Sequence, residues 1–132
     1  MAMAVIGIGV DAVEVERMRR AAGDTGLGLR FRARVFTDAE RRTCEARKDP
    51  AECFAARFAA KEAVMKALGA EGIAFAFRDI EVVRASSGSP SIRLHGRVAA
   101  RADELGVDAI HVSLTHVAPL ALASVVVEGA GR

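Results

Sequence analysis

Four side chains spaced four residues apart stand out near the middle of the chain. They are two phenylalanines, a glutamate and a lysine: Phe54, Phe58, Glu62 and Lys66. The surrounding segment is rich in Ala, Lys, Glu, Met and Leu and stops at Gly69, which is typical of a helix. Residues four apart share one helix face, so an apolar stripe continues directly into a carboxylate and an ammonium group. This arrangement favours a functional site, although an ordinary helix-stabilising Glu–Lys pair has the same spacing.

A second carboxylate, Asp11, follows two glycines near the start of the chain. The run GIGVDA at 7–12 matches the G-x-G-x-x-A dinucleotide fingerprint, but the chain lacks the alternating strand–helix–strand pattern which that fold requires. The glycines instead predict a strand end that turns tightly and presents Asp11 where a helix over 12–22 begins. Asp11 then either caps that helix or joins Glu62 in holding a hard cation such as Mg²⁺. In the second case Lys66, one turn from Glu62, neutralises a phosphate oxygen.

Composition narrows the functional class. The 132 residues are 52% hydrophobic, which suits a single folded domain over 1–132. The longest apolar stretch, 118–127, is too short to span a bilayer, and no basic residue precedes the apolar start, which argues against a secretory signal and for a cytoplasmic protein. The three histidines lack H-x-x-x-H spacing, so we do not expect zinc. Cys44 and Cys53 match no metal or redox spacing, and we expect two packed thiols.

Positive charge is concentrated between Arg17 and Arg34. This stretch contains six arginines and one acid, Asp24. It suits an anionic partner, or it is simply a solvated helix face. Nucleic acid is a poor candidate, because the chain has no Trp or Tyr for stacking and no recognisable nucleic-acid motif. An acidic protein fits the stretch at least as well.

The elements that must position these residues follow from periodicity and turn signals. We expect strands at 3–10, 79–84, 91–95, 109–114 and 122–127, and helices at 12–22, 37–47, 49–69 and 97–105. Thr37 and Glu40 form a capping-box sequence, and Pro50 suits the first turn of the long helix. Helices cluster early and strands late, which predicts an α+β fold with a largely antiparallel sheet.

The end of one expected strand, 112–116, carries hydroxyls and an imidazole. These groups either contact a nucleotide or are an ordinary hydroxyl-rich strand end. A Ser–His nucleophile pair would need an orienting acid and an oxyanion site, and neither can be identified in the sequence.

Taken in order, these segments resemble the holo-acyl-carrier-protein synthases, the short bacterial family of 4′-phosphopantetheinyl transferases. The matching motifs are GIGVD at 7–11, FTxxE at 36–40, RFAAKEAxxKALG at 57–69, DIEV at 79–82, GxP at 88–90 and VSxTH at 112–116. They cover nearly the whole chain, and the central motif is highly specific. The resemblance implies the fold of this family, with its sheet packed against the long central helix.

The resemblance also implies an activity. The family transfers the 4′-phosphopantetheine group of coenzyme A to a serine of apo acyl carrier protein, in fatty acid or polyketide biosynthesis, and releases adenosine 3′,5′-bisphosphate. Asp11 and Glu62 would bind Mg²⁺ at the pyrophosphate, and Lys66 would lie beside the transferred phosphate. The serine proton would pass to a metal-ordered water or to Glu62. Such a reaction needs alignment and charge neutralisation more than covalent help from the protein.

The same resemblance implies binding residues and an assembly. Coenzyme A would contact Phe54, Phe58, Lys66, Gly88, Pro90 and His116. The acidic carrier protein would contact Arg17, Arg20, Arg30 and Phe31. Family members of this size are typically homotrimers with active sites between subunits, so that Asp11 and Glu62 would come from different chains.

Three segments depart from the family pattern, and two other functions compete with it. The departures are Ala70-Glu71-Gly72 where Thr-Gly is usual, Ser89 where a basic residue is common, and Asp49-Pro50 where basic residues are frequent. An Mg²⁺-dependent hydrolase of the coenzyme A pyrophosphate would need no basic docking stretch. A non-catalytic module that binds carrier protein or coenzyme A would not need both carboxylates and Lys66.

Overall fold

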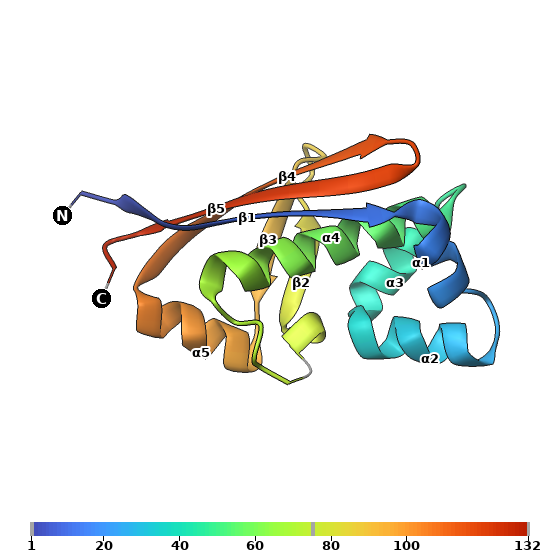
Figure 1. Ribbon diagram of the computed structural model, residues 1–132, viewed down its shortest axis with the longest axis horizontal. Coiled ribbons are helices and arrows are strands. Elements are labelled where there is room, and N and C mark those ends of the chain that lie inside the picture. The colour runs from blue at the N-terminus through green and yellow to red at the C-terminus, as the bar shows by residue number, and fades with distance from the viewer. Residues whose placement is uncertain (1, 75, 132) are drawn as a thin grey trace.

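The main sheet of the protein has three antiparallel strands and covers one side of a long helix (Figure 1). The computed structural model describes residues 2–74 and 76–131. The strands of this sheet, in spatial order, are β1 (Ala4–Glu14), β5 (Leu120–Gly129) and β4 (Val107–Val117). The long helix is α4 (Pro50–Leu68), and its buried residues form the centre of the core.

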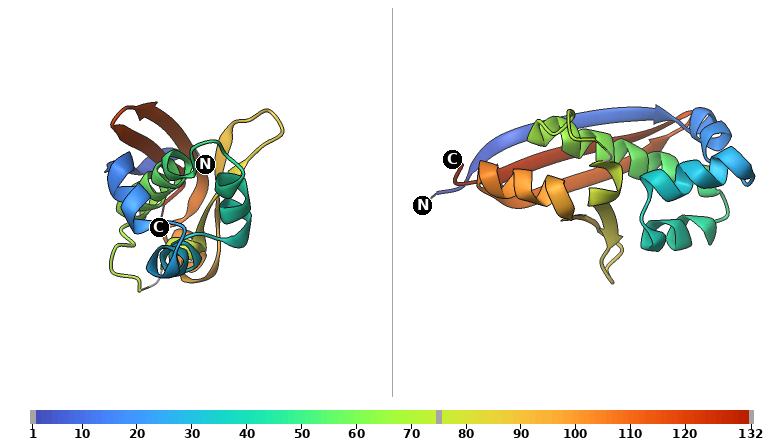
Figure 2. Two further views of the ribbon diagram at one scale, coloured as in Figure 1. Left: turned by 90° about the vertical axis from the view of Figure 1, so that its right-hand side faces the viewer. Right: turned by 90° about the horizontal axis from the view of Figure 1, so that it is seen from below.

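The remaining elements surround the other sides of α4. They are the helices α1 (Val15–Ala21), α2 (Gly26–Val35), α3 (Asp38–Glu45) and α5 (Gly96–Leu105), the short 3-10 helix η1 (Ala76–Asp79), and the strands β2 (Ile80–Arg84) and β3 (Pro90–Leu94). Helices α1 to α3 gather at one end of the molecule and α5 lies at the other (Figure 1). Strands β2 and β3 form a separate antiparallel hairpin that projects from the body (Figure 2). Within the described residues, no helix combines the length and the apolar character that crossing a membrane requires.

Much of this architecture agrees with the sequence prediction. The α+β class, the antiparallel sheet and the long helix are confirmed. The capping box is confirmed as well, since the Glu40 amide donates to Thr37 Oγ1 at 3.2 Å and the Thr37 amide donates to Glu40 Oε1 at 2.9 Å. Helix α4 ends where expected, at Gly69 in the left-handed conformation, with φ of 61°.

Two expectations about the N-terminal part were wrong. Strand β1 continues to Glu14, so the helix expected over 12–22 begins only at Val15, and Asp11 lies inside the strand instead of capping the helix. Helix α2 was not expected, because its three arginines and two glycines obscure the helical pattern in the sequence.

The glycines of the GIGVD motif make close packing possible. A Cβ atom at Gly7 or Gly9 would lie well under 3.0 Å from the carbonyl oxygen of Ala67 or Ala63, respectively. Helix α4 therefore lies directly on the backbone of β1, a contact that no other residue type allows. The expectation that these glycines serve a tight turn was wrong, since both lie in the middle of a long strand.

A buried ion pair ties α4 to its other neighbours. Lys61 Nζ donates to Glu40 Oε1 at 2.7 Å, to the carbonyl oxygen of Phe77 at 2.9 Å and to that of Ile80. The second carboxylate oxygen of Glu40 accepts from the Val82 amide at 2.9 Å. Burial lowers the pKa of Lys61, and the charge of Glu40 opposes that shift. Both partners are satisfied, so the pair fixes α4 against α3, η1 and β2.

The two cysteines also join α4 to α3. Cys44 at the end of α3 and Cys53 in the first turn of α4 form a disulfide, so the expectation of two packed thiols was wrong. The chain between these helices folds back sharply and brings the two Cα atoms to 5.3 Å, within the range that a disulfide spans. Sequence spacing alone does not reveal this reversal.

The packing of β1 on α4 gives a stability prediction. Replacing Gly9 by Ala places a methyl group against the Ala63 carbonyl and should lower the free energy of unfolding by about 1–3 kcal/mol, the usual cost of overpacking. Gly72 is the matched control, because an added Cβ there meets nothing within 4 Å and should change stability by less than about 0.5 kcal/mol. Urea unfolding of both variants tests this, and equal stability of the two would contradict the close-packing account.

Candidate functional site

The predicted metal ligands lie together in one pocket of the chain, which we call the carboxylate pocket. It has a volume of about 480 Å³ and its lining residues are Asp11, Ala12, Val13, Glu14, Arg17, Met18, Ala21, Phe31, Phe58 and Glu62. Asp11 comes from β1 and Glu62 from α4, and the close packing of these two elements brings them together. The expectation that Asp11 and Glu62 meet only across two chains was therefore wrong.

The charges of this pocket depend on one another and on Lys66, which lines a different pocket but contacts Asp11. Lys66 Nζ donates to Asp11 Oδ1 and to the Val10 carbonyl, both at 3.1 Å, and the bond to Asp11 raises the pKa of Lys66. Partial burial raises the pKa of Glu62, and the charge of Asp11 raises it further. Glu62 therefore lies in a place where an added cation is favourable.

The two carboxylates of this pocket suit a metal ion that takes its remaining ligands from phosphates and waters. Among the residues that the structure describes, there is no group of three or more His, Cys, Asp and Glu side chains able to hold a metal ion. Two carboxylates, Asp11 and Glu62, are what Mg²⁺ typically takes from a protein when phosphates and waters supply the remaining oxygens.

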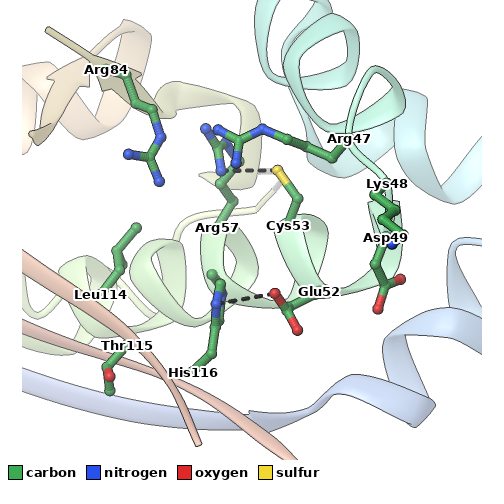
Figure 3. Close-up of a pocket in the computed structure, with 11 residues that line it drawn as sticks. Arg47, Lys48, Asp49, Glu52, Cys53, Arg57, Arg84, Leu114, Thr115 and His116 are labelled. Carbon is green, nitrogen blue, oxygen red and sulfur yellow. Dashed lines mark hydrogen bonds and ion pairs between the residues drawn. The ribbon is translucent and has the colours of Figure 1, made fainter. Parts of the chain in front are cut away.

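A second, larger pocket has the opposite charge, and we call it the cationic pocket. It has a volume of about 840 Å³ and lies where the α3–α4 connection, α4 and the ends of β2 and β4 meet (Figure 3). Its lining residues are Arg47, Lys48, Asp49, Glu52, Cys53, Ala56, Arg57, Arg84, Leu114, Thr115 and His116. His116 Nδ1 lies 3.2 Å from Glu52 Oε1 across the pocket. The predicted coenzyme A residue His116 thus lies in a pocket with an excess of positive charge.

Arg57 is the most unusual residue of the cationic pocket. Only 2% of it is exposed, and its Nη1 donates to Cys53 Sγ at 3.1 Å. Within the described part of the chain, its Nε has no hydrogen-bond partner and no carboxylate lies within ion-pair distance. Burial, followed by the charge of Arg84, lowers the pKa of Arg57 to about 10. A buried guanidinium without a counterion is costly, so this position favours binding of an anion.

Sequence reasoning missed Arg57, although it opens the central motif. The available signal was an arginine within the long apolar run 53–60, because a charge in a helix that is buried on most sides needs a reason. Arg47 and Arg84 were missed as well, since they come from separate segments that only the fold brings together.

The other predicted coenzyme A residues are distributed unevenly. Phe58 lines the carboxylate pocket and stacks on Phe77, with ring centroids 5.3 Å apart. Phe54 has no exposed surface and packs on Phe36, so the expectation that it lines the coenzyme A site was wrong. Gly88 and Pro90 lie on the β2–β3 hairpin and line neither pocket.

The basic stretch is divided between internal and exposed arginines. Arg32 is buried and donates to the Ala22 carbonyl, Asp24 and Glu45, so it holds the α1–α2 turn against α3. Arg17 and Phe31 of the predicted docking set line the carboxylate pocket. Arg20 and Arg30, the other two, are exposed.

Comparison with known proteins identifies the same family over nearly the whole chain. The model of the 4′-phosphopantetheinyl transferase superfamily matches residues 7–123. The holo-[acyl-carrier-protein] synthase of Anaeromyxobacter sp. (strain K) is 49% identical over 129 residues, which cover 96% of this chain and 98% of that protein.

Solved structures agree with the sequence relatives. The acyl carrier protein synthase of Mycobacterium tuberculosis has a TM-score of 0.73 and 35% identity, covering 96% of this chain and 99% of that one. The synthase–CoA complex of Chronobacterium ammoniagenes has a TM-score of 0.80 and 28% identity, covering 98% of each chain.

Replacing either of two buried cations on α4, Lys61 or Arg57, should change the stability of the protein in different ways. Replacing Lys61 by Met leaves the Glu40 carboxylate buried without its cation, and should lower the free energy of unfolding by about 3–5 kcal/mol. Replacing Arg57 by Met removes a buried charge that has no counterion among the described residues, and should leave this free energy unchanged or raise it by up to about 2 kcal/mol. Urea unfolding of both variants gives the comparison, and a large loss for Arg57→Met would mean that its charge is compensated within the chain.

Proposed function

Because this chain belongs to the 4′-phosphopantetheinyl transferase superfamily and, within it, to the holo-acyl-carrier-protein synthases, we propose a specific reaction for it. With Mg²⁺, it transfers the 4′-phosphopantetheine group of coenzyme A to a serine of a cytoplasmic apo acyl carrier protein, in fatty acid or polyketide synthesis. The observation that carries the proposal is a pair of carboxylates beside a lysine, accompanied by a separate pocket with an unpaired buried arginine.

In this proposal Asp11 and Glu62 hold Mg²⁺, which when bound supplies positive charge to the pyrophosphate of coenzyme A. Lys66 is already anchored on Asp11 and the Val10 carbonyl, so its ammonium is oriented toward the same region without further ordering. It neutralises charge on the phosphate that is transferred. Phe58 covers the apolar side of the carboxylate pocket and limits the access of water there.

The cationic pocket then receives an anionic group of coenzyme A. A phosphate there would give Arg57 the counterion that residues 2–74 and 76–131 do not provide, and Arg47 and Arg84 would add charge from two other segments. His116 and Thr115 supply further polar contacts at the end of β4. Gly88 and Pro90 remain proposed contacts on the hairpin that carries Arg84.

The carrier protein docks beside the carboxylates. Arg17 and Phe31 line the carboxylate pocket, and Arg20 and Arg30 are exposed on the helices that carry them. An acidic helix lying on these residues would bring its serine to the pocket that contains Asp11 and Glu62. This position supports transfer to a protein over transfer to water.

The exposed face of the main sheet supports the proposed homotrimer. Gly7 and Gly9 face α4, so the residues that alternate with them, Ile8 and Val10, face away, and they are 71% and 58% exposed. Exposed apolar residues side by side on a sheet are typical of an interface. The two pockets share no lining residue, so one subunit's cationic pocket would work with a neighbour's carboxylate pocket.

The transfer reaction is tested by intact-mass spectrometry of apo acyl carrier protein after incubation with the chain, coenzyme A and Mg²⁺. We expect a gain of one phosphopantetheine, its loss with EDTA, and a fall in rate of about 100-fold or more for Glu62→Gln, since charge stabilisation of this kind is worth that much. Glu104→Gln is the control, because Glu104 is exposed on α5 and should retain full activity. Near wild-type turnover of Glu62→Gln would refute the metal role, and cleaved coenzyme A with unmodified carrier would indicate a hydrolase.

The trimer is tested by light scattering coupled to size-exclusion chromatography. Wild type should have three times the monomer mass, and Ile8→Asp should shift it toward monomer, because the new carboxylate cannot be buried against another subunit. Leu27→Asp is the matched control, since Leu27 is 77% exposed on α2, away from the sheet. A monomeric wild type, or a trimer unaffected by Ile8→Asp, would contradict this interface.

A further inference from the structure

The disulfide forms part of the wall of the cationic pocket. Cys53 lines this pocket, whereas Cys44 is completely buried behind it. The bond closes a ring over 45–52, and this segment carries two of the pocket's cations, Arg47 and Lys48, together with two of its acids, Asp49 and Glu52. It therefore restrains two of the groups that would surround a bound anion.

The sulfur of Cys53 also touches the unpaired arginine. Arg57 Nη1 donates to Cys53 Sγ at 3.1 Å, and no described carboxylate competes for that guanidinium within ion-pair distance (Figure 3). As half of a disulfide this sulfur is neutral. As a free thiol beside a guanidinium it would ionise readily, because a neighbouring arginine lowers a thiol pKa. The thiolate would then be a counterion for Arg57, which has none among the residues that the structure describes.

We propose that the Cys44–Cys53 disulfide is a redox switch that controls the affinity of the cationic pocket for phosphate groups. In the oxidised protein the charge of Arg57 is available to a ligand, and Arg47 and Lys48 are held at the pocket. In the reduced protein the Cys53 thiolate pairs with Arg57, and the connection 46–49 between α3 and α4, which carries Arg47 and Lys48, loses its covalent restraint, so that affinity falls. The identity of the phosphate as that of coenzyme A rests on the function proposed above.

The chemistry of the switch is thiol–disulfide exchange with a dithiol. One thiolate of the dithiol enters through the pocket and attacks Cys53 Sγ, the sulfur–sulfur bond breaks, and Cys44 leaves as a thiolate that takes up a proton. The second thiol of the reagent then displaces Cys53 and closes the reagent's own disulfide. Two electrons pass from the dithiol to the protein. Disulfides in cytosolic proteins are usually transient and redox-sensing, which suits such a role in the compartment proposed for this chain.

The test is calorimetric titration of adenosine 3′,5′-bisphosphate into oxidised protein and into protein reduced with dithiothreitol. This probe carries phosphates and no thiol, so it cannot itself exchange with the disulfide. Counting of free thiols should give none before reduction and two afterwards. We expect the oxidised form to bind at least about five-fold more tightly, the lower end of typical coupling between two sites.

Two serine variants distinguish the effect of the Cys53 thiolate from the effect of losing the disulfide. Cys44→Ser keeps the Cys53 thiol beside Arg57 and should bind as weakly as reduced wild type, with or without dithiothreitol. Cys53→Ser has no thiol at Arg57 and should bind more tightly than Cys44→Ser, again without a response to the reductant. Equal affinity of these two variants would overturn the role of the thiolate.

A second measurement on wild type covers the case in which a variant does not fold. Because coupling between sites is reciprocal at equilibrium, saturating adenosine 3′,5′-bisphosphate should shift the equilibrium of reduction by dithiothreitol toward the disulfide by the same factor. Equal affinity in both redox states, or reduction unaffected by the ligand, would overturn the switch alone. Absence of binding in both states would overturn the assignment of the cationic pocket to coenzyme A together with the switch.

Discussion

The direct contact between the backbones of β1 and α4 is the constraint on which the rest of the structure depends. Because Gly7 and Gly9 have no side chains, the helix lies on the strand with nothing between them. This contact brings Asp11 of the strand within reach of Lys66 of the helix, and it joins Glu62 to the same pocket. The carboxylate pocket is thus a consequence of how two core elements pack, which gives the proposed metal ligands a rigid support.

Two buried cations of α4, Lys61 and Arg57, have different surroundings and therefore different roles. Lys61 faces the core and has a carboxylate and two carbonyls as partners, so its charge holds neighbouring elements in place. Arg57 is almost as deeply buried, but no carboxylate in the described part of the chain lies within ion-pair distance of it, so its charge remains available to a ligand. Two cations four residues apart on one helix therefore have different roles, one in stability and one in binding, and their contacts distinguish them where residue type does not.

Features that depend on short sequence patterns could be predicted, whereas features formed by segments far apart in the chain could not. The capping box at Thr37, the end of α4 at Gly69 and the antiparallel sheet follow from short-range signals, and all three are present. The family motifs identified Asp11 and Glu62, whose shared pocket the fold then explains. Neither the disulfide nor the convergence of Arg47, Arg57 and Arg84 could be read from spacing, because each depends on a chain reversal. The expectation for Phe54 was wrong because the helix face that it shares with Glu62 runs from the core into the site. Helical periodicity does not show at which residue the core ends and the site begins.

The pairing of β1 with β5 has a consequence for how the protein is made. Within the described residues β1 pairs with β5 alone, and β5 follows every other described strand along the chain, so β1 remains unpaired until β5 has been synthesised. Helix α4 packs against both strands and keeps part of its apolar surface exposed for the same interval. Contacts between such distant parts of a chain also slow folding. The nascent protein therefore passes through a stage in which protection of this surface by a chaperone would matter most, and its core is complete only once β5 has joined β1.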